Sequence, residues 1–180
     1  MIQSLEATIR LEGLISRAKK GERDAFASLY HEYFKPVYRY IYMRVGEIEQ
    51  AENLAQEVFL EALDNIDSFR YQEAPFGSWI FRIAHNQLVD HYRRSKKGFT
   101  RLVEPVSSGD HAGTVEQEME SQAMKKAIEM LPPRQREVIS LRLGADMSIE
   151  AIAKAIGATK GTVEKLQYEA LAEVKRLVGN

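Results

Sequence analysis

Apolar residues recur every three or four positions along most of this chain, and that spacing predicts helices. In the first half four such stripes follow one another, at residues 11–19, 26–41, 51–66 and 79–91. Gly21 is expected to end the first stripe, Asp24 to cap the second, and Pro75 to occupy the first helical position of the fourth. No stretch alternates apolar and polar residues as a half-buried strand would. The pattern predicts a compact all-helical domain over residues 1–97.

Residues 98–113 interrupt this pattern. They are rich in Pro, Ser and Gly and show no apolar period, which predicts a flexible linker. Beyond them, Thr114 and Gln117 have the spacing of a capping box, and a second helical set follows. The expected fold class is therefore all-α, with two small helical domains, 1–97 and 114–180, joined by a flexible linker.

The second domain contains the pattern of a helix-turn-helix. Ser148 is expected to cap a short helix, Gly157 to form the turn, and Thr159 to cap a longer helix. On the longer helix the residues expected to face inward are Val163, Leu166, Ala170, Leu171, Val174 and Leu177. Those expected to face outward are Lys160, Gly161, Glu164, Lys165 and Tyr168. A helix-turn-helix places such outward residues in the major groove, but helical hairpins without a DNA function look similar.

Charge is distributed unevenly although the 180 residues carry a net charge of only −1. Between residues 47 and 67 every charged residue is acidic, whereas residues 82–101 carry six Lys or Arg and one Asp. Oppositely charged faces on one domain are consistent with two different partners. Charge alone favours the simpler interpretation that both are ordinary solvated helix surfaces.

Several classes of function are excluded by what the sequence lacks. Without cysteine it has no disulfides and no thiolate ligands, and its four histidines show no metal-ligand spacing. There is no Gly-rich phosphate loop and no nucleophile–base arrangement. We therefore expect no enzyme, no catalytic residue, no metal and no cofactor. The chain also lacks a signal-peptide start and an apolar stretch of membrane-spanning length, which predicts a cytoplasmic protein with no membrane insertion.

A loop containing Phe69, Arg70 and Tyr71 is expected to lead into the basic helix. Aromatic rings beside Arg can stack on unpaired bases, while cations follow the phosphate backbone. The helix then carries polar residues at spacings that place them on one face: Arg82, Asn86, Asp90, Arg93 and Arg94. Trp79, at helical spacing, is assigned mainly to the core. This region is predicted to capture bases that have left the DNA stack.

Together these segments resemble the extracytoplasmic-function (ECF) sigma factors of the sigma-70 family. The resemblance covers nearly the whole chain outside the linker and the first helix. It is carried by Gly21-Glu-Arg-Asp-Ala-Phe26, Ala51-Glu-Asn-Leu-Ala-Gln-Glu-Val-Phe59, Gly77-Ser-Trp-Ile-Phe-Arg-Ile-Ala84, Asp90-His-Tyr-Arg-Arg94, Leu131-Pro-Pro-Arg-Gln-Arg-Glu-Val138, Ser148-Ile-Glu-Ala-Ile-Ala153 and Gly161-Thr-Val163.

The resemblance implies a transcription initiation factor that binds core RNA polymerase and promoter DNA, with an anti-sigma factor as a further partner. By analogy with the family, the residues that dock on polymerase are Glu52, Asn53, Gln56 and Glu57. Those implied to capture and separate the −10 DNA are Phe69, Arg70, Tyr71, Arg82, Asn86, Asp90, Arg93 and Arg94. Those implied to read the −35 element are Thr159, Lys160, Gly161, Thr162, Glu164, Lys165 and Tyr168.

Two departures from the family pattern affect these expectations. Gln50 and Asn53 stand where relatives usually have Asp, which weakens the expected electrostatic contact with polymerase. Glu164 and Glu169 stand where relatives often have Lys or Arg, which leaves the −35 sequence open. Two other functions are considered: a DNA-binding regulator that acts without polymerase, and a protein-interaction module with no DNA role.

Overall fold

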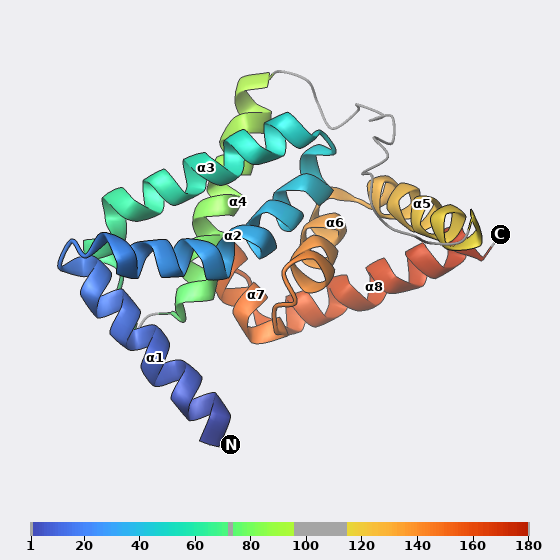
Figure 1. The fold of residues 1–180 in the computed structure, drawn as a ribbon. Coiled ribbons are helices and arrows are strands. Elements are labelled where there is room, and N and C mark those ends of the chain that lie inside the picture. The colour runs from blue at the N-terminus through green and yellow to red at the C-terminus, as the bar shows by residue number, and fades with distance from the viewer. Residues whose placement is uncertain (1, 72–73, 96–114, 180) are drawn as a thin grey trace.

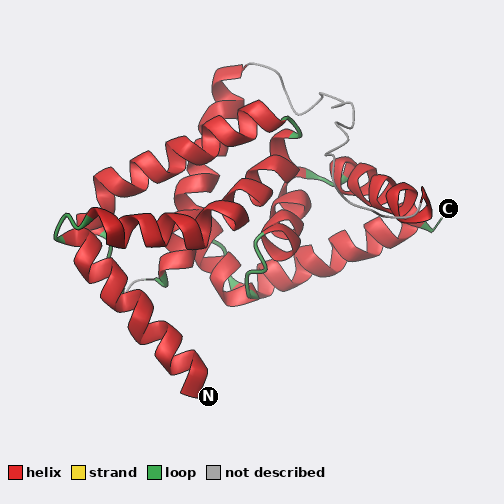
Figure 2. Ribbon diagram, viewed as in Figure 1, coloured by secondary structure: helices red, strands yellow, loops and turns green. Residues whose placement is uncertain are grey.

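The computed structural model describes residues 2–71, 74–95 and 115–179; for residues 2–5 and 115–122 it describes the backbone alone. The described part contains helices and no strand (Figure 2), as the all-α prediction requires. In chain order the helices are α1 (Ile2–Lys19), α2 (Arg23–Val45), α3 (Ile48–Asn65), the 3₁₀ turn η1 (Ile66–Ser68), α4 (Phe76–Ser95), α5 (Val115–Met130), α6 (Pro133–Ile139), the π-helical turn η2 (Ser140–Gly144), α7 (Ile149–Ile156) and α8 (Lys160–Val178).

Helices α1 to α4, with η1, form the N-terminal lobe. Its core is built from the apolar stripes read in the sequence, and its largest fully buried side chains include Leu29, Tyr40 and Phe76. Gly21, at φ 81°, turns the chain between α1 and α2, as its position predicted.

Two predicted helix starts in this lobe are wrong by one or two residues. Helix α2 begins at Arg23 with Glu22 as its N-cap, and Asp24 lies inside the first turn. An acid there is still favourable, because it faces the positive end of the helix dipole. Helix α4 begins at Phe76, one residue after Pro75.

Helices α5 to α8, with η2, form the C-terminal lobe, and its helix-turn-helix is confirmed. The Ser148 side chain caps α7 by accepting from the amide of Ala151 at 3.1 Å. Gly157 adopts φ 66°, a left-handed conformation that glycine reaches at little cost. Thr159 caps α8 by accepting from the amide of Thr162 at 3.2 Å. One inward assignment on α8 is wrong, because Leu171 is 46% exposed.

The two lobes pack directly against each other (Figure 1). Helix α4 lies along α7, and α2 lies along η2. Buried residues of both lobes, such as Phe81 of α4 and Ile152 of α7, belong to one continuous apolar cluster. The predicted linker 98–113, Thr114, and the basic residues beyond Ser95 lie outside the described residues.

Among the described residues, no helix is both long and apolar enough to span a bilayer. No group of three or more His, Cys, Asp or Glu in that part of the chain is placed to hold a metal ion.

Candidate polymerase and nucleic-acid interfaces

Helix α3 has an apolar face on one side and an acidic face on the other. Ala51, Leu54, Ala55, Val58 and Phe59 are buried against the rest of the lobe. The four residues predicted to dock on polymerase, Glu52, Asn53, Gln56 and Glu57, are all exposed on the opposite face. Their spacing of one, four and five positions groups them within two turns of the helix. The four residues therefore share one accessible surface of α3.

The first departure from the family pattern has a local partner. The side-chain amide of Gln50 donates to a carboxylate oxygen of Glu47 at 2.6 Å, within the first turn of α3. An Asp at position 50 would instead face that carboxylate with a like charge. Asn53 is exposed and lies among the other docking residues.

Phe69 does not lie where a base-stacking residue must lie. It is 2% exposed, and its ring packs against Phe76 and Trp79 at centroid distances of 5.4 and 5.2 Å. Its carbonyl accepts from the Lys19 ammonium at 2.5 Å, which ties the loop to α1. The prediction that Phe69 stacks on a free base is wrong in this structure, since an aromatic ring buried among others is part of the core.

Arg70 and Tyr71 remain beside this cluster. The Arg70 guanidinium is exposed and donates to the carbonyl of Asp67 at 2.6 Å. Tyr71 is half-buried, with its ring edge-on to Phe69. Trp79 is partly buried against the core, as expected from its spacing. Tyr71 is therefore the better-placed aromatic of the loop for contact with a base.

Helix α4 presents the predicted polar face. Arg82, Asn86, Asp90, Arg93 and Arg94 are all exposed. The Asp90 carboxylate lies 3.4 Å from the Arg93 guanidinium, a solvated pair that restrains Arg93 weakly. Toward the end of α4 this face meets the acidic side of α3 along a shared groove, lined by Glu57, Asp64, Asp90, Arg93 and Arg94 among others.

Arg82 has an unexpected partner on the C-terminal lobe. Its guanidinium donates to the carbonyl of Lys154, in the last turn of α7, at 2.6 Å. Carbonyls in the last turn of a helix lack intrahelical partners and form the negative end of the helix dipole, so a cation there is well satisfied. Four residues earlier on α4, the Ser78 hydroxyl donates to the carbonyl of Ala151 at 3.2 Å. A residue predicted to contact −10 DNA is thus engaged by the helix-turn-helix.

At the start of α8 and on its first turns, the seven residues predicted to read the −35 element are all exposed: Thr159, Lys160, Gly161, Thr162, Glu164, Lys165 and Tyr168. The two cations among them are paired. Lys160 lies 2.6 Å from Glu150 of α7 and 3.9 Å from Glu164, while Lys165 lies 3.8 Å from Glu169. The hydrogen bond between Lys160 and Glu150 raises the pKa of the lysine and lowers the pKa of the carboxyl. This surface is close to electrically neutral.

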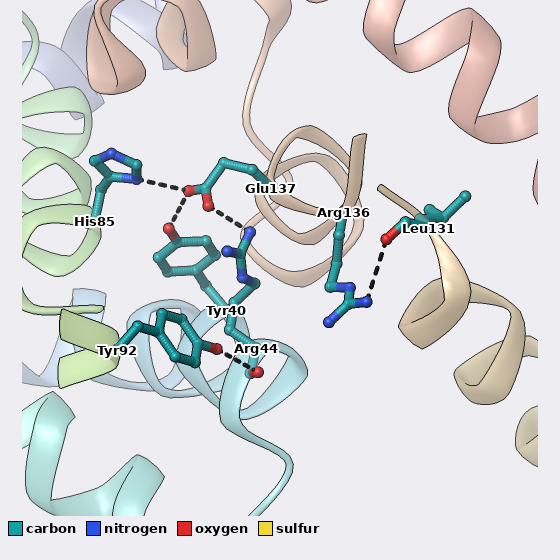
Figure 3. A network of polar contacts seen from close by, with 7 residues as sticks. All are labelled: Tyr40, Arg44, His85, Tyr92, Leu131, Arg136 and Glu137. Atoms are coloured by element: carbon teal, nitrogen blue, oxygen red, sulfur yellow. Dashed lines mark hydrogen bonds and ion pairs between the residues drawn. The ribbon is translucent and has the colours of Figure 1, made fainter. Parts of the chain in front are cut away.

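Sequence reasoning missed a buried carboxylate between the lobes. Glu137 of α6 is 6% exposed and accepts hydrogen bonds from Tyr40 and Arg44 of α2, and its carboxylate lies 3.1 Å from Nδ1 of His85 on α4 (Figure 3). Burial by itself raises the pKa of Glu137, but the His85 hydrogen bond and the Arg44 charge outweigh it and hold the pKa below its usual value. The only signal in the sequence is that Glu137 lies next to the buried Val138 and one turn before Leu141.

Comparison with known proteins first defines the class. Residues 29–98 match the family model of sigma-70 region 2, and residues 121–174 match that of sigma-70 region 4. The fold agrees with that of CnrH, solved with the cytosolic domain of CnrY, at a TM-score of 0.72 and 23% identity, over 92% of this chain and 95% of CnrH. It also agrees with that of the sigma factor RpoE from Bartonella quintana, solved with the anti-sigma factor NepR, at a TM-score of 0.71 and 22% identity, over 86% and 96% of the two chains.

The sequence relatives define the family. The ECF RNA polymerase sigma factor BldN of Streptomyces coelicolor is 37% identical over 179 residues, which cover 94% of this chain and 66% of BldN. The ECF RNA polymerase sigma factor SigW of Bacillus subtilis is 31% identical over 164 residues, which cover 83% of this chain and 87% of SigW. The chain belongs to the ECF sigma factors of the sigma-70 family. It is a non-enzymatic transcription initiation factor that binds core RNA polymerase and directs promoter-specific initiation.

Proposed function

We propose that this sigma factor divides its work among three helices: α3 docks on core RNA polymerase, α4 captures the −10 DNA, and α8 reads the −35 duplex. In this proposal residues 1–97 form the domain for docking and melting, 98–113 the linker, and 114–180 the domain for the −35 element. The observation that carries the proposal is that the predicted residues on each of these helices are exposed on a single face.

Docking through α3 rests on its acidic face. Glu52 and Glu57 stand about one turn and a half apart, and among the described residues neither forms an ion pair, although Glu57 shares a groove with Arg93 and Arg94. Their charge is therefore available to a basic surface. Reversing both charges, Glu52→Lys with Glu57→Lys, is expected to lower affinity for purified core polymerase at least about tenfold, because like charges then meet. Glu12→Lys, on the exposed side of α1, is the control and should leave the affinity unchanged. Asn53→Asp, which adds a carboxylate to the same face, is expected to raise the affinity.

Capture of the −10 DNA is assigned to α4 and the loop before it. Arg93 and Arg94, near the end of α4, supply positive charge for phosphates, and Asn86 supplies an amide that can donate to and accept from a base edge. Arg70 and Tyr71 lie beside the start of the helix, where stacking would hold a base that has left the duplex. Phe69 is assigned to the core that supports this loop.

Reading of the −35 duplex is assigned to the first turns of α8. Thr159 and Thr162 are linked at 2.8 Å through their hydroxyls, which orients the start of the helix. The exposed Glu164 can accept a hydrogen bond from the amino group of cytosine, and Lys165 and Tyr168 lie on the same side. Since Lys160 and Lys165 are paired with acids, this lobe is expected to hold DNA weakly by itself and to depend on polymerase for effective concentration.

The location and one further partner follow from this assignment. Polymerase and the chromosome lie in the bacterial cytoplasm, and we place this factor there. We also include an anti-sigma factor as a proposed partner, as the family implies.

The test of the proposed function is transcription from fragmented genomic DNA by purified core polymerase with and without this protein. New RNA 5′ ends that share two upstream motifs would support the proposal and identify both promoter elements. If no new ends appear and polymerase is not bound, the assignment of α3 is wrong for the unmodified chain. The same experiment with Gln50→Asp and Asn53→Asp then decides whether the two amides prevent docking.

A further inference from the structure

The exposed side of α8 from Thr159 to Tyr168, which we call the reading surface, contains one charge that no neighbour balances closely. Lys160 is drawn toward α7, because its ammonium lies 2.6 Å from the carboxylate of Glu150. Lys165 lies 3.8 Å from Glu169, one turn later on α8. Glu164 stands between the two lysines and is exposed, and its one ion pair among the described residues, with Lys160, is 3.9 Å long. The reading surface therefore has a loosely paired carboxylate at its centre.

The acids that hold the two lysines are tied to other parts of the lobe. Glu150 belongs to the first turn of α7. Glu169 accepts a hydrogen bond from the side-chain amide of Gln135, on α6, at 3.3 Å. Glu164 has no such tie, and in the part of the chain that the structure describes its carboxylate accepts no hydrogen bond. Its oxygens remain available to a donor outside the protein.

The position of Glu164 on α8 suits contact with a base. In a helix-turn-helix the N-terminal residues of the second helix contact base edges. Glu164 lies four residues after Lys160, the first residue of α8, so both are on one face of its first two turns. The residue before it, Val163, is fully buried in the core, which fixes the rotation of the helix about its axis. Glu164 is thus held on the side of α8 that enters the groove.

A carboxylate on a DNA-binding surface weakens the binding of every sequence that gives it no donor. Duplex DNA carries one negative charge per about 1.7 Å of its axis, and these phosphates repel Glu164. In the major groove only cytosine and adenine present a donor, the amino group of each base. The adenine donor stands beside the acceptor N7, which repels a carboxylate, whereas cytosine presents its amino group without an acceptor on its own major-groove edge. Cytosine is therefore the base that best offsets the repulsion.

We propose that Glu164 makes this sigma factor selective for a C·G base pair at one position of the −35 element, both by accepting a hydrogen bond from cytosine and by repelling base edges that present acceptors there. The proposal rests on the assignment of α8 to the −35 duplex and adds the identity of a base. Relatives often have Lys or Arg where this chain has Glu164, and those side chains donate to guanine. The change from cation to acid thus alters which base is read, and not only how strongly DNA is held.

The test measures transcription by core polymerase with the full-length protein from a promoter library whose −35 element is randomised. Sequencing of the RNA gives the preferred base at each position. The variants are Glu164→Gln, Glu164→Arg and Glu164→Ala, all exposed substitutions to good helix formers. Glu129→Gln, on the exposed side of α5, is the matched control, because it removes a carboxylate from the same lobe away from the reading surface. Circular dichroism verifies that each variant keeps its helical content.

The wild type and Glu129→Gln should prefer cytosine at one position of the −35 element by at least about fivefold. At that same position Glu164→Gln should prefer adenine, because an amide pairs with both N6 and N7, and Glu164→Arg should prefer guanine, because it donates to O6 and N7. Glu164→Ala should discriminate less than about twofold there. It should also bind a −35 duplex without this cytosine more tightly than the wild type does, since the repulsion from phosphates is removed.

A base analogue tests the hydrogen bond itself. When that cytosine is replaced by 2-pyrimidinone, which lacks the amino group, the affinity of the wild-type holoenzyme for the duplex should fall at least about fivefold. The holoenzyme with Glu164→Ala should lose less than about twofold, because it makes no contact with the amino group. This comparison also corrects for the weaker pairing of the analogue, which affects both proteins equally.

The outcomes separate this inference from the proposed function. A wild type that initiates from a −35 element with no preferred cytosine, or variants that all keep the cytosine preference, would overturn the role of Glu164 alone. Loss of the preference without a shift to adenine or guanine, together with equal effects of the analogue on both proteins, would show that Glu164 supports α8 and does not contact the base. If the wild type neither initiates transcription nor binds polymerase, the proposed function itself fails.

Discussion

The two surfaces that we assign to DNA are both exposed, but they are restrained by different neighbours. On α4, Arg82 is held by a backbone carbonyl of the other lobe at 2.6 Å. On α8, Lys160 is held by Glu150 of the preceding helix in the same lobe, also at 2.6 Å. Separation of the lobes frees Arg82 and leaves Lys160 paired. The −10 surface therefore depends on the arrangement of the lobes, whereas the −35 surface is the same wherever its lobe lies.

The surfaces also differ in charge. Of the two arginines near the end of α4, Arg93 forms one long ion pair with Asp90, and Arg94 donates to the Asp90 carbonyl, with further acids across the α3–α4 groove. Each lysine at the start of α8, in contrast, is paired with glutamate. Phosphate attraction scales with the number of free cations. The α4 surface is thus suited to hold DNA by charge, and the α8 surface by shape and hydrogen bonds.

The largest effect is expected when the α4 surface is removed. In the variant Arg82→Ala, Asn86→Ala, Arg94→Ala, three polar contacts to DNA are lost, and even about 1 kcal/mol for each lowers promoter-specific transcription about 100-fold. Affinity for core polymerase, measured separately, should change less than about twofold, because docking is assigned to α3. Arg10→Ala with Arg17→Ala on α1 is the control and should keep transcription. Retained promoter-specific transcription in the triple variant would show that α4 is not the −10 surface.

The next effect concerns the start of α8. Thr159→Ala removes the side chain that caps α8, at a cost of about 1 kcal/mol in the stability of the helix. Because the first turn must then be ordered on DNA, binding of a promoter whose −35 element has been mapped is expected to fall by up to about fivefold. Thr159→Ser keeps an acceptor at the same place and should restore most of the binding. If Ser fails to restore it, the Thr159 methyl group matters and the capping explanation is wrong. Deletion of the −35 element from the template should abolish the difference between all three proteins.

A smaller effect is expected from Glu150→Gln, which removes the closer of the two acids beside Lys160 and leaves only Glu164, at 3.9 Å. Affinity of the holoenzyme for a −35 duplex at low salt should rise about threefold, and the plot of log affinity against log salt should become steeper by about 0.9, the contribution of one additional phosphate contact. Glu12→Gln, on α1, is the control for net charge. An unchanged slope would mean that Lys160 does not contact a phosphate even when it is free.

The smallest effect is expected when the pH is lowered, which weakens the packing of the two lobes. The pKa of Glu137 is lowered while the lobes are packed and returns to its ordinary value of 4.5 if they separate. The packing is therefore favoured above pH 4.5 and is lost progressively as the pH falls from 4.5 toward the lowered pKa. Small-angle X-ray scattering at pH 6 and pH 4 should show expansion of the wild type and little further change in Glu137→Gln. Equal expansion of both proteins would assign the pH response to other groups.

Much of the candidate site could be predicted from the sequence because it depends on local rules. Helical spacing places the polar residues between Glu52 and Glu57 on the exposed side of α3, opposite its buried face. The same spacing places those between Arg82 and Arg94 on the exposed side of α4. Ser148, Gly157 and Thr159 act on neighbours within one turn, so their capping and turning roles could be read directly.

The errors have a common cause. Phe69 was assigned to an exposed loop because it follows a helix end, but packing against Phe76 and Trp79 decided its burial. Leu171 lies at an apolar position of the helical period, yet no other helix covers it, and it remains exposed. A periodic pattern identifies a face of a helix but does not show how much of that face a neighbour covers.

The helices, the helix-turn-helix and the exposed faces of α3, α4 and α8 follow from contacts within one or two helical turns, and the order of residues along the chain is enough to predict them. The partners of Arg82, 72 residues from Lys154, and of Tyr40, 97 residues from Glu137, depend on tertiary packing. A buried carboxylate can accept from many donors, and which donors reach it depends on which helices pack together.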